Sequence, residues 1–142
     1  MTLDVTMDPD AGYVPAYAHE GDAGLDLRAV EDYTIAPGES AMVRTGLHCE
    51  IPRWHVGLQF PRSGLGSKGI TMRNAVGVID SGYRGEVKCA LWNTTGEPFE
   101  VHRGDRICQL VVMPYAPCFV REVPKLSDSE RGTDGYGSTG VR

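Results

Sequence analysis

Glycine and proline interrupt this chain so often that few segments could form a helix of ordinary length. The 142 residues include 18 glycines and 9 prolines, spread along the whole sequence. Residues 25–36, LDLRAVEDYTIA, form the longest segment without either. Both residue types disfavour the interior of a helix, so the chain is expected to fold from short strands joined by turns.

The segments between these breaks carry the pattern of half-buried strands. Within 25–36 most apolar residues fall on odd positions, the period of two that is typical of a strand with one buried face. The other predicted strands are short and rich in β-branched or aromatic residues: 40–45, 55–60, 86–93, 99–103, 107–115 and 118–123. We therefore predict an all-β fold, a barrel or sandwich in one domain, followed by a polar tail after Pro124.

The overall charge excludes some classes of partner. The net charge is −5, which argues against nucleic acid or an anionic membrane surface as the main partner. A local cluster of arginine and lysine could still hold a small anion. The first ten residues, MTLDVTMDPD, have no basic region followed by an apolar run, and no apolar run has the length of a membrane span. The expected location is the cytoplasm.

The cysteines and histidines show no spacing that suggests a metal site. Cys49, Cys89, Cys108 and Cys118 include no C-x-x-C pair, so each is expected to be a small, reduced core residue in a strand. The four histidines have no metal-ligand spacing either, and we expect them on the surface or in loops.

Two segments match the dinucleotide-binding pattern G-x-G-x-x-G, but neither has the required context. In that fold the motif opens a helix whose N-terminus binds pyrophosphate. Residues 64–69, GLGSKG, precede a segment that indicates strand and turn, and residues 135–140, GYGSTG, precede only two residues. A Rossmann fold is therefore not predicted, although glycine-rich turns can still bind phosphate through their backbone N–H groups.

Polar residues that could act on a nucleotide lie among these glycine turns. Each alone has a structural explanation: Asp80 could form a turn, Gln109 could be a satisfied core amide, and Arg62 could be a surface charge. Together, and in this order, their segments resemble five motifs of the trimeric dUTPase family, over nearly the whole chain. The five segments are AGLDLRA (23–29), PRSGLGSKG (61–69), GVIDSGYRGEV (77–87), GDRICQL (104–110) and RGTDGYGSTG (131–140).

This resemblance implies an enzyme that hydrolyses dUTP to dUMP and pyrophosphate with Mg²⁺ on the triphosphate. It implies a jelly-roll-like, distorted β-barrel of the β-clip type, assembled as a homotrimer with three active sites between subunits. Residues 1–126 would form the catalytic barrel. Residues 127–142 would form a flexible arm that crosses to a neighbouring subunit and closes over the nucleotide.

The resemblance also assigns the catalytic roles. Asp80 matches the residue that orients a water for attack on the α-phosphorus and holds the sugar 3′-hydroxyl, work that suits a carboxylate because it can accept the proton of the water. Gln109 would help to fix this water. Ser63 would lie near the bridging oxygen whose negative charge grows as the bond breaks.

The remaining roles concern binding. Tyr83 would pack under the deoxyribose and leave no room for a 2′-hydroxyl, and Asn74 with the backbone at Gly77 and Val78 would recognise uracil. The other matched positions surround the triphosphate: Arg62 and Gly64 in the phosphate-binding turn, and Asp26 near the metal, acting through water.

In the arm, Arg131 and Ser138 would bind the γ-phosphate and Tyr136 would stack on the uracil, with Gly137 allowing the arm to close. Many relatives have Phe in place of Tyr136 and Gly in place of Asp134.

Two other functions remain to be weighed. A dCTP deaminase shares this fold but needs a glutamate in the strand after the hairpin, where this chain has Ala90, so deamination is disfavoured. A protein of this fold that serves in protein–protein signalling cannot be separated from an enzyme by the sequence.

Overall fold

The computed structural model describes residues 1–133, and this part of the chain is built almost entirely from strands. It contains eleven strands and one short helix, α1 (Ser63–Gly66). The strands are β1 (Asp4–Met7), β2 (Leu25–Arg28), β3 (Tyr33–Ile35), β4 (Ser40–Val43), β5 (Leu47–Glu50), β6 (His55–Pro61), β7 (Ile70–Met72), β8 (Gly77–Ile79), β9 (Cys89–Asn93), β10 (Phe99–Val101) and β11 (Arg106–Pro114). Within the described residues no helix is long and apolar enough to cross a membrane.

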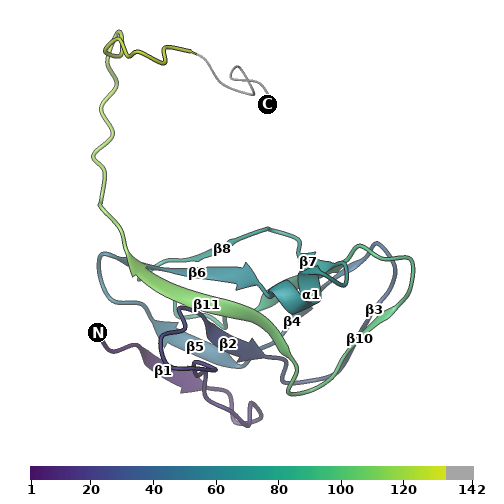
Figure 1. The fold of residues 1–142 in the computed structure, drawn as a ribbon. Helices are drawn as coiled ribbons and strands as arrows, with labels where there is room; N and C mark the ends of the chain where they lie inside the picture. The colour runs from purple at the N-terminus through teal and green to yellow at the C-terminus, as the bar shows by residue number, and fades with distance from the viewer. Residues whose placement is uncertain (134–142) are drawn as a thin grey trace.

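The strands form four small antiparallel sheets, and Figure 1 labels the strands in the ribbon. The largest has the order β2-β11-β6-β8, and a three-stranded sheet has the order β4-β9-β7. Two further pairs, β1-β5 and β10-β3, complete the strand body. Most neighbours in space are distant in sequence, so the residues of one surface come from several of the segments predicted above.

Alternation along the strands fills one apolar core. In β9, Cys89, Leu91 and Asn93 are buried, whereas the Trp92 side chain between them reaches the surface. Asn93 is fully buried because its amide donates to the carbonyls of Ile35 and Glu97, at 2.9 and 2.7 Å. The all-β prediction is therefore confirmed.

Three local predictions were wrong. The segment 25–36 forms two strands, β2 and β3, because the backbone N–H groups at Ala29 and Val30 leave the strand pattern and donate to Asp105 and Arg44. Residues 118–123 form no strand within the described chain, since no neighbouring strand pairs with them. Cys118, which lies in this segment, is exposed, whereas the other three cysteines are buried as expected.

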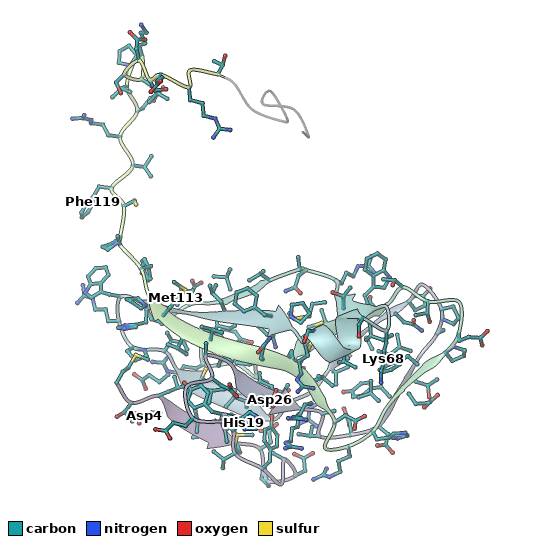
Figure 2. The ribbon with its side chains drawn as sticks, in the orientation of Figure 1. Asp4, His19, Asp26, Lys68, Met113 and Phe119 are labelled. Carbon is teal, nitrogen blue, oxygen red and sulfur yellow. The ribbon has the colours of Figure 1, made fainter. Side chains whose placement is uncertain are left out.

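The strand body ends at Pro114, and the chain then runs away from it (Figure 1). Phe119, labelled in Figure 2, is fully exposed on this extended stretch, and Val120 is 97% exposed. The predicted boundary between residues 126 and 127 therefore lies well beyond the last strand, and it stays a prediction.

Candidate active site

A hollow of about 450 Å³ opens beside the segment that follows β7. We call it the hairpin hollow. Its lining includes five predicted site residues and one that the sequence did not single out: Asn74, Gly77, Val78, Asp80, Tyr83 and Gln59. The structure thus brings together the residues expected to recognise base and sugar with the residue expected to activate water.

A tight turn sets the place of Asp80. Strand β8 ends at Ile79, and the Asp80 carbonyl accepts a hydrogen bond of 3.0 Å from the Tyr83 N–H. The Asp80 residue is exposed at the surface. Its carboxylate therefore stands where a ligand in the hairpin hollow could reach it.

Tyr83 is held by the backbone that follows it. A Cβ atom placed on Gly85 would lie only 2.4 Å from the Tyr83 hydroxyl oxygen, so the glycine leaves room for the ring in its present position. The Tyr83 hydroxyl donates a 3.1 Å hydrogen bond to the Glu86 carbonyl oxygen. This hydrogen bond anchors the hydroxyl end of the ring, and the residue remains 46% exposed.

The turn between β7 and β8 carries Asn74 and a residue in an unfavourable backbone conformation. Ala75 has a φ of 58°, in the left-handed region that non-glycine residues rarely adopt. The neighbouring Val76 N–H donates to the Asn74 carbonyl at 2.6 Å. Strain of this kind is often found at ligand sites, and here it shapes the segment that carries Asn74 and Gly77.

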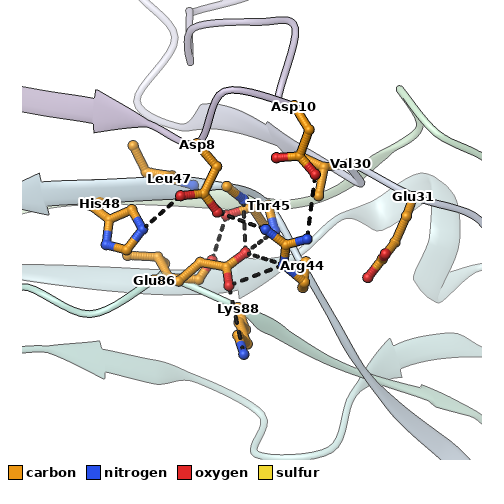
Figure 3. A network of polar contacts seen from close by, with 12 residues as sticks. Asp8, Asp10, Val30, Glu31, Arg44, Thr45, Leu47, His48, Glu86 and Lys88 are labelled. Carbon is orange, nitrogen blue, oxygen red and sulfur yellow. Dashed lines mark hydrogen bonds and ion pairs between the residues drawn. The ribbon is translucent and has the colours of Figure 1, made fainter.

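Glu86 ties this region to the turn between β4 and β5, as Figure 3 shows. One Glu86 carboxylate oxygen accepts hydrogen bonds from the N–H groups of Thr45 and Gly46, at 3.1 and 2.9 Å. The same carboxylate lies 3.4 Å from Arg44 Nε. Arg44 also pairs with Asp8 at 2.7 Å, and these carboxylates raise the pKa of the Arg44 guanidinium, the Asp8 hydrogen bond most of all.

A second hollow, of about 610 Å³, holds the remaining predicted residues of the strand body. We call it the arginine hollow. Its lining includes Asp26, Arg62, Ser63, Gly64 and Gln109. Asp26, labelled in Figure 2, has one carboxylate oxygen 2.9 Å from Arg62 Nε and the other 3.1 Å from Arg106 Nη1. The ion pairs hold the Arg62 side chain beside the glycine-rich segment.

The other members of the arginine hollow come from two different elements. Ser63 begins α1, a single helical turn in a segment that the sequence indicated as a glycine-rich turn. Gln109 lies in β11, directly across from Asp26 in β2, and its amide donates to the Pro61 carbonyl at 3.2 Å. A Cβ atom on Gly24 would lie 2.4 Å from the Gln109 side-chain oxygen, so the glycine gives this amide its space.

The two hollows share no lining residue, and the largest sheet separates them. In the register of β6 and β11, Gln109 faces Phe60, whereas Gln59 faces Leu110. Because alternate residues point to opposite faces of a sheet, the side chains of Gln59 and Gln109 lie on opposite faces. Within one chain, the structure does not bring Asp80 and Tyr83 together with Ser63 and Gln109.

The predicted arm residues lie in or beyond the extended tail. Arg131 is exposed in the last described turn. Tyr136, Gly137 and Ser138 lie outside the described residues, as does Asp134. Ala90, where a deaminase would need a glutamate, lies in the middle of β9 across from Met42 of β4.

Three contributors were missed by the sequence reasoning. Arg106 pairs with Asp26, the Glu86 carboxylate accepts from the backbone of the turn between β4 and β5, and Gln59 lines the hairpin hollow. The sequence offered one signal for Gln59, because it is a polar residue between two apolar neighbours in the predicted strand 55–60. No sequence signal pointed to the other two, since their partners are far away along the chain.

The described residues include no group of three or more acidic, histidine or cysteine side chains that could hold a metal ion. Asp26 uses both carboxylate oxygens in ion pairs with arginine. Asp22 is the other carboxylate in the lining of the arginine hollow. This donor set fits Mg²⁺ that is bound mainly by phosphate oxygens and water, with a carboxylate acting through water.

Comparisons with known proteins agree with this geometry. The dUTPase family model matches residues 10–140. The deoxyuridine 5′-triphosphate nucleotidohydrolase of Clostridium acetobutylicum is 47% identical over 143 residues, covering 100% of this chain and 99% of the relative. Among solved structures, a mutant dUTPase of Staphylococcus bacteriophage 80alpha with dUpNHpp superposes with a TM-score of 0.92, at 28% identity and 99% coverage of both chains.

A mutant dUTPase from phage phi11 of S. aureus, whose structure concerns the coordination of a structural Mg(II) ion, gives a TM-score of 0.81 at 26% identity. The match covers 88% of this chain and 98% of the phage phi11 dUTPase. The matched residues run through all five sequence motifs and both hollows. The chain belongs to the dUTPase family.

Proposed function

We propose that the dUTPase reaction of this chain, the hydrolysis of dUTP to dUMP and pyrophosphate, takes place between subunits of a homotrimer. The hairpin hollow of one subunit would face the arginine hollow of another. One observation carries this proposal: the residues expected to act on a single nucleotide lie on opposite faces of one sheet. A second subunit can supply the missing half of each site.

In this assembly the hairpin hollow binds the nucleoside and positions the water. Asp80 accepts a proton as the water attacks the α-phosphorus, and Gln109 of the facing subunit helps to orient that water. The Tyr83 ring, whose hydroxyl donates to the Glu86 carbonyl, supports the deoxyribose and excludes a 2′-hydroxyl. The backbone at Gly77 and Val78, with Asn74, recognises uracil, because cytosine would leave buried donors and acceptors unpaired.

The arginine hollow binds the triphosphate. Arg62, held by Asp26, supplies positive charge, and the glycines of its segment let the backbone approach phosphate oxygens. Ser63 donates to the bridging oxygen as negative charge develops there. Mg²⁺ bound by the phosphates would neutralise charge on the leaving pyrophosphate, with Asp26 acting on it through water.

The extended tail supports an exchange of arms within the trimer. Phe119 and Val120 are almost fully exposed in the single chain, a poor arrangement for apolar side chains unless another surface covers them. We infer that residues 127–142 act as an arm that closes over the nucleotide of a neighbouring subunit. Arg131, Tyr136, Gly137 and Ser138 would make its contacts. The strand body would then be the jelly-roll-like, distorted barrel of the β-clip type, in a cytoplasmic enzyme.

An experiment with mixed subunits tests the shared site. Asp80→Asn and Arg62→Ala change different hollows, and each variant alone is expected to be nearly inactive. If each site combines two subunits, trimers formed from both variants contain some sites with two intact halves, and dUTP hydrolysis returns. If mixed trimers form but show no recovery, the site lies within one subunit and the proposal is wrong.

A second assay separates hydrolysis from deamination. The purified protein would be given Mg²⁺ with dUTP, dCTP, dTTP or UTP, and pyrophosphate and ammonia would be measured separately. Pyrophosphate from dUTP alone is the expected result. Ammonia from dCTP would instead favour the deaminase reaction, even though this chain has Ala90 where a deaminase needs its glutamate.

A further inference from the structure

Asp80 and Tyr83 belong to one exposed turn that lies outside the apolar core. The Tyr83 N–H donates to the Asp80 carbonyl at 3.0 Å, which closes the turn, and both residues are exposed. A Cβ atom placed on Gly82, inside the turn, would have no neighbour within 4 Å in the described part of the chain. A glycine with open space around it leaves the backbone many accessible conformations. The turn therefore depends on hydrogen bonds, more than on packing, to keep its shape.

Arg84 supplies such hydrogen bonds. Its Nη1 donates to the Ser81 carbonyl at 2.7 Å and to the Tyr83 carbonyl at 2.9 Å. Hydrogen bonds from a guanidinium are charge-assisted, and they are stronger than those between neutral groups. One nitrogen of Arg84 thus holds two peptide groups of the turn, which limits the movement of the backbone that carries Asp80.

The rest of the Arg84 residue is attached to β5. Its Nη2 lies 2.9 Å from Glu50 Oε1. Its backbone carbonyl oxygen lies 3.0 Å from His48 Nδ1, and since a carbonyl can only accept, this nitrogen carries the proton. His48 and Glu50 are two residues apart on β5, so their side chains leave the same face of the strand. Both the side chain and the main chain of Arg84 therefore join the turn to one strand.

Strand β5 is a firm support for the turn. It pairs with β1 from Leu47 to Glu50, and on its other face Leu47 and Cys49 are buried in the core. His48 is held from the β1 side as well, because its Nε2 lies 3.3 Å from an Asp8 carboxylate oxygen, as Figure 3 shows. The contacts of Arg84 thus connect a loosely packed turn to a strand that is fixed by the core.

We propose that Arg84 is a positioning residue for hydrolysis: it couples the turn that carries Asp80 to β5, and so keeps the carboxylate where it can accept the proton of the attacking water. This inference rests on the proposed function, in which Asp80 is the base. A base must lie within hydrogen-bond reach of the proton that it accepts, and a displacement of about 1 Å can cost about a hundredfold in rate. Uracil recognition is assigned to residues 74–78, before the turn, so loss of Arg84 should affect turnover more than binding.

The first test is Arg84→Met, which keeps a long side chain but donates no hydrogen bond. We expect kcat for dUTP to fall about tenfold, with KM changed by less than about threefold. Arg84→Lys should recover most of this loss, because one ammonium group can donate to both carbonyls. Arg53→Met is the matched control and should leave kcat unchanged, since Arg53 is also exposed, stacks on Trp54 and lines neither hollow. Equal kcat in Arg84→Met and Arg84→Lys would overturn the proposal.

A second test asks whether Arg84 acts through Asp80. The base is absent in Asp80→Asn, so adding Arg84→Met to it should lower kcat no further. If the two losses multiply instead, Arg84 acts independently of the base and the proposal is wrong. Asp80→Asn alone separates the two levels of inference. If it leaves turnover intact, the proposed function itself is wrong; if it reduces turnover while Arg84→Met behaves as wild type, only the role of Arg84 is wrong.

Glu50→Ala is a further variant that leaves the turn itself unchanged. It removes the attachment of the guanidinium to β5, so kcat should fall about threefold, the size expected when an exposed ion pair is lost. It should add nothing to the effect of Arg84→Met. Glu50 is exposed, so the fold should remain intact, and circular dichroism checks this. An unchanged kcat in Glu50→Ala would contradict the coupling of the turn to β5.

Discussion

The Tyr83 hydroxyl donates a hydrogen bond to the backbone carbonyl of Glu86, and the Glu86 carboxylate in turn accepts from the backbone of the turn between β4 and β5. One residue thus holds the aromatic ring through its main chain and the strand body through its side chain. Figure 3 shows that this carboxylate also lies in a network with Arg44 and Asp8.

Replacing Glu86 by Ala is expected to lower the free energy of unfolding by about 2 kcal/mol, because the N–H groups of Thr45 and Gly46 lose their acceptor in a buried turn. Glu86→Gln is the matched variant, since its side-chain carbonyl can still accept both hydrogen bonds. It should lose less than half as much. Urea denaturation measures both values, and equal losses would show that the charge of Glu86, and not these hydrogen bonds, stabilises the turn.

Tyr83→Ala should increase hydrolysis of UTP relative to dUTP, because the smaller side chain leaves space for a 2′-hydroxyl. Tyr115→Ala is a suitable control: both tyrosines are 46% exposed, and Tyr115 lines neither hollow. The ratio of kcat/KM for the two nucleotides is the quantity to measure. An unchanged ratio in Tyr83→Ala would exclude steric selection by this ring.

Asp80→Asn should reduce turnover at least about a hundredfold while dUTP affinity changes by less than about tenfold, since the amide cannot accept the proton of the attacking water. Steady-state kinetics and equilibrium binding of a non-hydrolysable dUTP analogue provide the two measurements. Asp4→Asn, in β1 and outside both hollows, controls for the loss of one negative charge. Turnover close to wild type in Asp80→Asn would rule out its role as the base.

Ending the chain after Leu126 should leave the fold intact, because every strand of the described chain ends by Pro114. Turnover should fall about a hundredfold, since the nucleotide would lose the contacts that hold it for reaction. Lys125→Ala, which removes an exposed ion pair with Asp128 without shortening the tail, is the control. Circular dichroism reports the fold, and full activity in the shortened chain would show that the arm is dispensable.

Because the pKa of Tyr13 is raised in the folded protein, the folding stability is expected to fall at alkaline pH. Burial is the main cause that raises the pKa of its phenol above 10.0, and the hydroxyl bridges the Thr45 carbonyl and the Arg28 N–H, at 3.0 Å each. The folded state therefore holds the proton more tightly than the unfolded state. The stability that this provides is present below pH 10 and is lost as the pH rises through the folded pKa.

In Tyr13→Phe this titration is absent, so the difference in unfolding free energy between wild type and variant should shrink above pH 10. Urea denaturation on both sides of that pH measures it. Tyr17→Phe, at an exposed position, is the control. A difference that stays constant with pH would mean that Tyr13 does not titrate differently in the two states.

Much of the site was predictable because its signals are local. The short run of mostly apolar, β-branched residues at 107–115 predicted β11 almost to the residue, and with it the position of Gln109. Glycine turns around Asp80 and Arg62 predicted where polar side chains would be presented. The similar composition of residues 118–123 gave a wrong prediction, because a strand also needs a neighbour, and no local pattern says whether one is present.

The amino-acid sequence by itself determined the all-β class and the residue types that each turn presents, since both follow from periodicity and backbone preference over a few residues. Only the tertiary structure decided which of these residues meet. Asp26 lies across from Gln109 through strand register, Gln59 shares a hollow with Asn74, and the two hollows lie on opposite faces of one sheet. Such neighbours depend on pairing between strands that are distant along the chain, where the free energy of the whole core sets the register.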